Sequence, residues 1–392
     1  MIKIKPVEEK KPTPFILGAH ITGLNLIRNF GRKGFDVYGL DHNPKAPGLV
    51  SKYCTSLLNP NPRNFEKEYI DFLVKIGQKK KHKGVLFPTS DIDALAILKN
   101  KKLLENYYHF TLSNYRTSNL LINKELFFQT LEENNILYPK TYYPKKISDL
   151  YEINKKAKYP CLVKPKYSAF FRMDFKRKCF IANNLNQLIY FYKLSLSKKN
   201  DVIVQEMIQG EACDMYGYNA YYNKKNRPNG IFSYRRIRQW PPIIGNGCLL
   251  EENHPSEFEK IITPLLKKIN YFGLVDAEFK RDTEEDKYYL IEINPRAWMQ
   301  IGFPTRCGYD HAYMAYLDAI DEEIQLDKKD NVDKWLLFQD DICSAILDIS
   351  KKKISIQDYI LSLKGKRENA FFCWDDPLPF IKSLSYGRVL KV

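Results

Sequence analysis

Two segments with strand-like patterns stand on either side of a short polar stretch: FGLVDAEFKRD at 272–282 and KYYLIEINPR at 287–296. Apolar runs separated by a short polar turn predict a β-hairpin. Side chains on one face of a strand recur at every second residue, so Glu292, Asn294 and Arg296 share a face of the second strand. An acid and an arginine are rarely buried without partners. The hairpin therefore constrains the fold and requires a polar partner or ligand at this face.

Glu278 and Lys280 share a face of the first strand by the same rule. If the hairpin pairs in register, the carboxylates of Glu278 and Glu292 and the amide of Asn294 converge on one spot. Mg²⁺ usually takes one or two carboxylates together with substrate phosphates, and Arg296 could clamp phosphoryl oxygens beside it. A solvent-facing cluster of salt bridges on an antiparallel sheet is the alternative.

The chain has 392 residues, of which 44% are apolar, and it carries a net charge of +16. It is too long for one ordinary domain, so we expect two or three subdomains. The charge suits anionic partners such as nucleotides, phosphorylated substrates or nucleic acid. No RRM, KH or zinc pattern supports nucleic-acid binding, and the basic residues form no helix-long stripe. A steep salt dependence of DNA binding would indicate it.

The eight cysteines are scattered, without a CxxC pair or a Cys/His cluster of zinc spacing. Reduced thiols in a cytosolic protein are the simple interpretation. No apolar stretch reaches the roughly 18 residues of a membrane helix, and the N-terminus does not resemble a signal peptide. We therefore expect a cytoplasmic protein without membrane insertion.

The N-terminal third alternates strand and helix patterns. PFILGA at 14–19 reads as a buried parallel strand, a second strand ends in Asp41, and KGVLFPTSD at 83–91 is a later strand. This alternation predicts a doubly wound α/β unit. His20 occupies the position of the second glycine in the dinucleotide fingerprint, which argues against NAD binding. Asp91 lies at a strand end where such sheets bind ligands, with helix capping as the alternative.

Two lysines in the central region call for anionic partners. The segment at 121–143 predicts a helix and then a short strand, with Lys124 at the helix start, where the macrodipole disfavours a cation. YPCLVKP at 159–165 is an apolar strand that carries Lys164. A lysine within such a strand needs an anion nearby.

The next segment, KYSAFFRMDFKRK within 166–180, predicts an aromatic, basic hairpin without a glycine. Loops that cradle phosphate are usually glycine-rich. Arg172, Lys176, Arg177 and Lys178 could supply charge instead. Lys178 is favoured because it continues into the apolar strand CFIA. We expect this hairpin to be a lid.

DVIVQEMIQGE at 201–211 predicts a buried strand that runs into a polar turn. The backbone from Glu206 to Ile208 could pair with the edge of a ligand, although an ordinary strand ending is the alternative. A later pair of predicted strands ends in a cluster of arginines, namely Arg235, Arg236 and Arg238.

These motifs occur in the order found in the ATP-grasp superfamily of carboxylate–amine ligases: an α/β domain, YPCLVKP, VQEMIQGE, VDAEFKRD and LIEINPR. The resemblance runs from about residue 14 to about residue 320. Within the superfamily, RRIRQWPPIIGNG and FKRDTEEDKYYLIEINPRAW are most similar to the D-aspartate ligase group. The stretch FFCWDDPLPF at 371–380 is also similar to the ends of that group.

The resemblance implies an α/β fold in which a Rossmann-like pre-ATP-grasp domain precedes an α+β ATP-grasp domain with a mobile lid. The expected parts are the pre-ATP-grasp domain (1–120), the lid subdomain (121–210), the core subdomain with the magnesium site (211–320) and a C-terminal extension (321–392). The glycine-free segment 166–180 departs from many relatives, so how it closes over phosphates stays open.

The resemblance also implies roles for individual residues. The nucleotide-binding residues would be Lys124, Lys164 and Lys178 at the phosphates, Glu206, Met207 and Ile208 at the adenine, and Glu211 or Asp214 at the ribose. The metal ligands would be Glu278, Glu292 and Asn294. The catalytic residues would be Arg296, Arg238 and Lys280.

The implied reaction is ATP-dependent amide formation through an acyl-phosphate, with two Mg²⁺ ions or Mn²⁺ in their place. The substrate would be an amino acid, such as the acidic D-aspartate, joined to an amine of a peptide or cell-wall precursor, and a homodimer is compatible with it. A nucleotide-binding protein without ligase activity and a nucleic-acid-binding protein are the alternatives. The intact acids and Arg296 argue against a dead enzyme.

Overall fold

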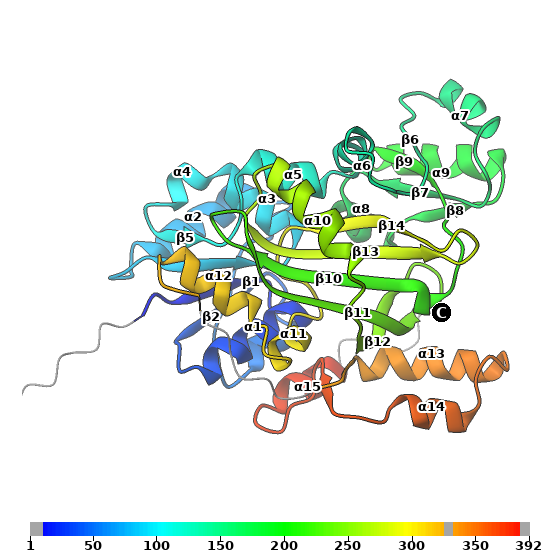
Figure 1. Ribbon diagram of the computed structural model, residues 1–392. Helices are drawn as coiled ribbons and strands as arrows, with labels where there is room; N and C mark the ends of the chain where they lie inside the picture. The colour runs from blue at the N-terminus through cyan, green and yellow to red at the C-terminus, as the bar shows by residue number, and fades with distance from the viewer. Residues whose placement is uncertain (1–10, 325–331, 385–392) are drawn as a thin grey trace, which may run out of the picture.

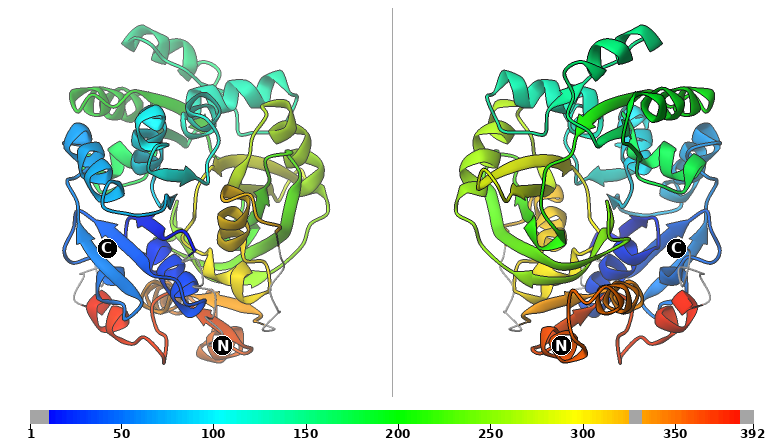
Figure 2. Two further views of the ribbon diagram at one scale, coloured as in Figure 1. Left: turned by 90° about the vertical axis from the view of Figure 1, so that its left-hand side faces the viewer. Right: turned by 90° about the vertical axis from the view of Figure 1, so that its right-hand side faces the viewer.

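The computed structural model describes residues 11–324 and 332–384, and its principal strands form three sheets (Figure 1). The N-terminal sheet lies on the left of Figure 1, the largest sheet in the centre and the smallest at the upper right. Figure 2 shows the same three parts from two sides, with the C-terminal helices along the lower edge. No helix in the described ranges is long and apolar enough to cross a membrane.

The N-terminal sheet has five parallel strands in the order β3-β2-β1-β4-β5. The strands are β1 (Pro14–Leu17), β2 (Val37–Asp41), β3 (Cys54–Leu58), β4 (Gly84–Pro88) and β5 (Tyr108–Phe110). The helical segments are α1 (Ile21–Arg32), η1 (Pro47–Val50), α2 (Glu66–Gly77), α3 (Asp91–Lys99), α4 (Lys101–Leu104) and α5 (Tyr115–Ile122). Strands β1 and β4 are buried along their whole length, as expected for parallel strands covered on both faces. The predicted α/β unit is confirmed.

Residues 124–206 contain a four-stranded antiparallel sheet in the order β6-β9-β7-β8, and we call them the lid after the predicted lid subdomain. Its strands are β6 (Thr141–Tyr142), β7 (Cys161–Pro165), β8 (Phe180–Ala182) and β9 (Val202–Glu206). Its helices are α6 (Lys124–Glu133), α7 (Ile147–Asn154), α8 (Ser168–Phe175) and α9 (Leu185–Ser197).

The largest sheet has seven strands in the order β14-β13-β10-β11-β12-β15-β16. They are β10 (Met215–Tyr222), β11 (Pro228–Trp240), β12 (Asn246–Glu252), β13 (Gly273–Asp282), β14 (Lys287–Asn294), β15 (Lys334–Leu336) and β16 (Arg367–Asn369). The other helical segments before residue 325 are η2 (Ala212–Asp214), α10 (Glu257–Lys268), α11 (Gly302–Arg306) and α12 (His311–Ala319). The C-terminal helices are α13 (Phe338–Ser350), α14 (Ile356–Ser362) and α15 (Leu378–Leu384).

Strands β15 and β16 come from the predicted C-terminal extension, and they join the edge of this central sheet. The extension is therefore built into the core. The four-part division of the chain stays a prediction.

The predicted hairpin at 166–180 is wrong: most of it is helix α8. Phe171 and Phe175 are four residues apart, which brings their rings together on one face of a helix with centroids 4.6 Å apart. Phe171 is fully buried and also contacts Phe180 of β8. The aromatic spacing in this segment follows the helical period, and tertiary packing against β8 selects it.

Asp41, at the end of the second strand, has a structural role. Its carboxylate accepts hydrogen bonds from the backbone N–H groups of Ala19 (2.8 Å) and Asn43 (2.8 Å), and the residue is 3% exposed. Gly18 in the same turn has φ +97°, and an added Cβ would lie 2.2 Å from Thr89 Oγ1. Protein groups thus close this turn.

Candidate active site

Strands β13 and β14 pair antiparallel and place polar residues opposite one another. Glu278 faces Glu292, and Asp276 faces Asn294. The predicted convergence of the two glutamates and the amide is confirmed. Asp276 was not predicted, although its position two residues before Glu278 puts it on the same face of the strand. All four side chains contribute to one cavity.

A cation accompanies each of the two glutamates. Arg236 of β11 lies 2.7 Å from Glu278, and Lys124 at the start of α6 lies 2.8 Å from Glu292. Burial opposes the charged form of Glu292, but the ammonium group of Lys124 outweighs it and lowers the pKa of this carboxyl. Burial and the neighbouring Glu278 raise the pKa of Asp276 to about 7.

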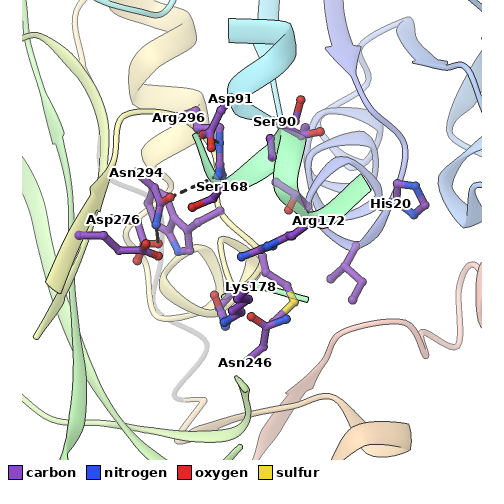
Figure 3. A pocket seen from close by; sticks show the side chains of 18 of the residues that line it. His20, Ser90, Asp91, Ser168, Arg172, Lys178, Asn246, Asp276, Asn294 and Arg296 are labelled. Carbon is purple, nitrogen blue, oxygen red and sulfur yellow. Dashed lines mark hydrogen bonds and ion pairs between the residues drawn. The ribbon is translucent and has the colours of Figure 1, made fainter. Parts of the chain in front are cut away.

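Arg296 is held at the edge of this cluster by two side chains and by the Ala297 carbonyl (3.0 Å). Its Nε donates to Asp91 Oδ1 (2.6 Å), and its Nη2 donates to Asn294 Oδ1 (3.2 Å). Figure 3 shows Arg296, Asp91, Asn294 and Asp276 on one side of the cavity, with Arg172 and Lys178 reaching toward them from the lid. The carboxylate of Asp91, the first residue of α3, thus orients Arg296. The sequence did not indicate this contact between two distant parts of the chain.

Two cavities meet at this cluster. The first, of about 510 Å³, lies between the N-terminal domain, the central sheet and the C-terminal helices. The second, of about 310 Å³, lies between the lid and the central sheet. Residues that line both cavities are Lys124, Ser168, Arg172, Lys178, Arg236, Glu278 and Glu292. Most of these shared residues are charged, so a group lying at the junction would meet cations and acids from both sides.

The second cavity gathers most of the residues predicted to bind a nucleotide. Its lining includes Lys124, Lys164, Lys178, Glu206, Met207, Ile208, Glu211 and Lys280. The Glu206 N–H already donates to the Lys140 carbonyl (2.9 Å). The edge of a ligand would therefore pair with other backbone groups of this turn. The Lys280 ammonium group donates to the Glu211 carbonyl (2.5 Å), which fixes the turn that follows β9.

Two of these lysines are partly buried. Lys164 donates to Gln205 Oε1 (2.6 Å), and burial together with nearby Lys124 lowers its pKa to about 8. Lys178 donates to the Gly245 carbonyl (3.0 Å), and burial together with nearby Arg172 lowers its pKa to about 7. Cations held in this way are strong sites for an anion, because an anion restores the charged form.

The two candidates for the ribose differ in the structure. Asp214 is 8% exposed, and its carboxylate accepts from the Glu211 N–H (2.7 Å), which caps η2. Asp214 is absent from the described lining of the second cavity, whereas Glu211 belongs to it. The placement favours Glu211 over Asp214 at the ribose, and both stay predictions.

Arg238, predicted as a catalytic residue, pairs in the structure with a different carboxylate, and its catalytic role stays a prediction. Its guanidinium group pairs with both oxygens of Asp341 (2.7 and 3.1 Å) and donates to Ser362 Oγ (2.8 Å). It lines neither of the two cavities described here. The pairing of β11 with β12 shifts between Arg236 and Arg238, and such a bulge turns the two side chains to different surroundings. Of these two arginines of β11, Arg236 is the one that pairs with Glu278.

Arg172 is the least constrained cation at the junction. It lies on α8 and is exposed, and its side chain makes no hydrogen bond or ion pair with the described part of the chain. Helix α8 itself is fixed: Arg63 forms two hydrogen bonds to the Asp174 carboxylate (2.8 and 2.9 Å) and one to the Phe170 carbonyl (3.2 Å). The arginine is thus presented from a supported helix toward both cavities.

The donor set fits magnesium. Glu278 and Glu292 offer two facing carboxylates, and Asn294 adds an amide oxygen that also accepts from Arg296. No three His, Cys, Asp or Glu side chains gather as metal ligands within the described ranges. An ion held only partly by protein, with substrate phosphates completing its shell, is characteristic of Mg²⁺.

Comparisons with known proteins agree with this architecture. No family model matches the chain. A D-aspartate ligase of Enterococcus faecium is 24% identical over 333 residues, which cover 80% of this chain and 78% of that protein. The biotin carboxylase domain of a 2-oxoglutarate carboxylase from Hydrogenobacter thermophilus, solved with MgADP, ADP and bicarbonate, superposes with a TM-score of 0.64. It is 14% identical and covers 82% of this chain and 72% of its own.

An L-amino acid ligase of Bacillus licheniformis superposes with a TM-score of 0.60 at 13% identity, covering 81% of this chain and 78% of its own. The chain has the ATP-grasp fold. The resemblance to ATP-grasp carboxylate–amine ligases, and among them to D-aspartate ligases, is thereby confirmed. Within this fold, the glycine-free segment between β7 and β8 is helix α8.

Replacing Arg238 with alanine is expected to lower the free energy of unfolding by about 3–5 kcal/mol, because it leaves the buried Asp341 carboxylate unpaired. The affinity for nucleotide should stay the same. Urea unfolding and calorimetry measure the two quantities. Arg235→Ala is the control: its pair with Glu251 is partly exposed, and about 0–1 kcal/mol is expected. A stable Arg238→Ala protein that no longer binds nucleotide would contradict the structural role.

Proposed function

We propose that this protein is an ATP-dependent carboxylate–amine ligase that forms an amide bond through an acyl-phosphate and releases ADP and phosphate. The observation that carries the proposal is the meeting of two cavities at one charged junction. The second cavity, under the lid, is the place for the nucleotide. The first cavity, beside the N-terminal domain, is the place for the carboxylate and the amine. The γ-phosphate would then lie at the junction between Arg172, Lys178 and the acids.

The substrate we favour is an amino acid, in particular an acidic one such as D-aspartate, joined to an amine of a peptide or cell-wall precursor. Support comes from the D-aspartate ligase of Enterococcus faecium, whose sequence aligns with this chain over most of the length of both. Three arginines, Arg172, Arg236 and Arg296, line the first cavity and suit a substrate with carboxylate groups.

In the first step a carboxylate oxygen attacks the γ-phosphorus, and the bond to the β-phosphate oxygen breaks, which releases ADP. Lys124, Lys164 and Lys178 would neutralise charge on the phosphates, and Arg296 would hold the phosphoryl oxygens. Mg²⁺, as one or two ions held by Glu278, Glu292 and Asn294, would supply further charge neutralisation. Lys280 would act indirectly in this arrangement, by fixing the turn at Glu211.

In the second step the amine attacks the acyl carbon, and the carbon–oxygen bond to phosphate breaks. The amine loses a proton and an amide forms. Water must be excluded while the acyl-phosphate exists, and the lid helix α8 would cover the junction for that time.

The function is tested by a screen for ADP release in which amino acids are crossed with amine acceptors. For the active pair, a substrate with ¹⁸O in its carboxylate should transfer one labelled oxygen to inorganic phosphate. Label in AMP would show adenylation and overturn the proposal. ADP release without an amide product in any combination would leave a nucleotide-binding protein without ligase activity.

Nucleotide binding is expected to take up protons near pH 8 and almost none near pH 6. The pKa values of Lys178 (about 7) and Lys164 (about 8) leave both lysines partly neutral at pH 8, and bound phosphates favour their charged forms. Calorimetry in buffers of different ionisation enthalpy measures the uptake.

Lys164→Met should reduce this uptake and weaken binding. Without ligand, the variant should be as stable as the parent or more stable, since the depressed pKa means that burial of the ammonium group is unfavourable. Proton release on binding, or a large fall in the melting temperature of Lys164→Met, would contradict the role of these lysines.

A further inference from the structure

Large apolar side chains that are exposed gather in the C-terminal segments. Among the described residues, twenty such side chains are exposed, and nine of them lie between residues 338 and 384. The nine are Phe338, Ile346, Ile356, Ile360, Leu361, Trp374, Leu378, Ile381 and Leu384. Single exposed apolar residues are normal on a protein surface, but a concentration of this kind marks an interaction site.

Helix α14 is oriented with its apolar residues outward. None of its seven residues is buried. Ile356 is 65% exposed and Ile360 is 59% exposed, and residues four apart share one face of a helix. Tyr359, on another side, has the guanidinium group of Arg238 4.9 Å from its ring centre, so the helix is fixed to the core through its polar and aromatic side.

Basic residues flank α14 on both sides. Lys351, Lys352 and Lys353 precede it, and Lys364, Lys366 and Arg367 follow it; all six are exposed. Asp358 is the sole acid between residues 351 and 367, and it is used locally, where it accepts from Ser355 in a capping box. An apolar strip with cations at both ends is therefore presented to the outside.

A second apolar group lies beyond β16. Trp374 is 88% exposed, and Leu378 and Ile381 of the following segment are 56% and 59% exposed. This segment is attached to the N-terminal domain, because the carboxylate of Asp376 accepts a hydrogen bond from the buried Arg28 of α1 (2.9 Å). Figures 1 and 2 show α14 and α15 along the same lower edge of the molecule in every view. We call α14, Trp374 and α15 the C-terminal face.

We propose that the C-terminal face binds the surface of an anionic lipid bilayer. Outward isoleucines on α14 and the exposed indole of Trp374 suit the boundary between headgroups and acyl chains. The flanking lysines suit anionic headgroups. A second copy of this chain is a poorer occupant, because a two-fold interface pairs a patch with itself and would bring the same lysine clusters close together.

Binding of this kind would place the first cavity beside the bilayer. Gln339, Asp340, Phe371 and Ser383, from the same C-terminal segments, form part of the wall of that cavity. The surface proposal does not depend on which reaction the cavity performs.

The test is co-sedimentation of the full chain with two kinds of vesicle: phosphatidylcholine alone, and phosphatidylcholine mixed with phosphatidylglycerol. Binding is expected only to the mixed vesicles, and it should weaken as salt is raised. Tryptophan emission should shift to the blue on binding and lose that shift in Trp374→Phe. Trp298 and Trp335 are almost fully buried and should not respond.

Matched variants separate this site from general adsorption of a basic protein. Lys351→Gln with Lys352→Gln should weaken binding by about 30-fold, from roughly fivefold per charge near an anionic surface. Lys79→Gln with Lys81→Gln removes the same charge from another exposed run and should have little effect. Ile356→Ser with Ile360→Ser should also weaken binding, whereas Tyr190→Ser with Leu196→Ser on α9, also exposed, should not.

Three results would overturn the proposal. The first is no binding to the mixed vesicles at low salt. The second is an equal loss of vesicle binding in the two double lysine variants, with no loss in Ile356→Ser with Ile360→Ser, which would mean adsorption by net charge. The third is a dimer in light scattering that Ile356→Ser with Ile360→Ser dissociates, which would assign the face to a second copy. Melting temperatures of all variants should match that of the parent, because every substituted side chain is exposed.

Discussion

Glu292→Gln is expected to lower kcat/KM by at least about a hundredfold, which corresponds to about 3 kcal/mol of transition-state stabilisation. The change removes one of the two carboxylate charges that face each other across β13 and β14 and keeps the shape of the side chain. Glutamine retains an oxygen for the Lys124 ammonium group, so the fold should be preserved. Steady-state rates and thermal unfolding measure the two effects.

Glu285→Gln is the matched control, because Glu285 lies in the turn of the same hairpin and is half exposed in a pair with Lys287. Its rate should equal that of the parent. Calorimetry of ATP binding with and without Mg²⁺ should show that the metal strengthens binding to the parent and has much less effect on Glu292→Gln. An equal dependence on Mg²⁺ in both proteins would remove the metal-ligand role of Glu292.

Arg172→Gln is expected to weaken ATP binding by about 10- to 100-fold and to leave ADP binding nearly unchanged. A charge-assisted hydrogen bond contributes about 1.5–3 kcal/mol, and the position of Arg172 at the junction of the cavities suits the γ-phosphate, which ADP lacks. Arginines that meet a transferring phosphoryl group accelerate the reaction by about 10³-fold or more, so kcat should fall by this order. Arg172 has no described partner to lose, so stability should not change.

Arg177→Gln is the control for the charge of the lid, since Arg177 is exposed just after α8 and lines neither of the two cavities described here. It should leave both nucleotide affinities unchanged. Equal weakening of ATP and ADP by Arg172→Gln would place this arginine at the α- or β-phosphate. No weakening of either would show that α8 does not cover the nucleotide.

The acids at the hairpin could be predicted in part from local rules. The period of two fixes which residues share a side, and the short polar turn sets the register beside it. A bulge between Glu278 and Phe279 then shifts this register by one residue and places Glu278 opposite Glu292, which the sequence did not indicate. The same reasoning extended by one step would have found Asp276. The order of motifs along the chain was enough for the ATP-grasp resemblance, and the comparisons bear it out.

The lid segment shows the limit of local rules. Its lack of glycine was visible in the sequence, but its secondary structure depended on Phe171 finding a buried place against β8. The contact of Arg63 with Asp174 joins residues 111 positions apart, and no local sequence pattern predicts such a pair. Helix α8 and the position of Arg172 therefore came from tertiary packing.

The arginines of β11 separate the two kinds of information most clearly. The sequence by itself determined that a strand ends in several arginines beside a set of acids, because residue type and period are local properties. Which arginine meets the acids was decided only by the tertiary structure. A shift in the pairing of β11 with β12 sends Arg236 to Glu278 and Arg238 to Asp341, a residue about a hundred positions further along the chain. The partners of these charged side chains are set by a bulge and by a carboxylate far along the chain. The physical reason is that a buried charge needs a counter-ion, and only the complete fold brings the counter-ion close.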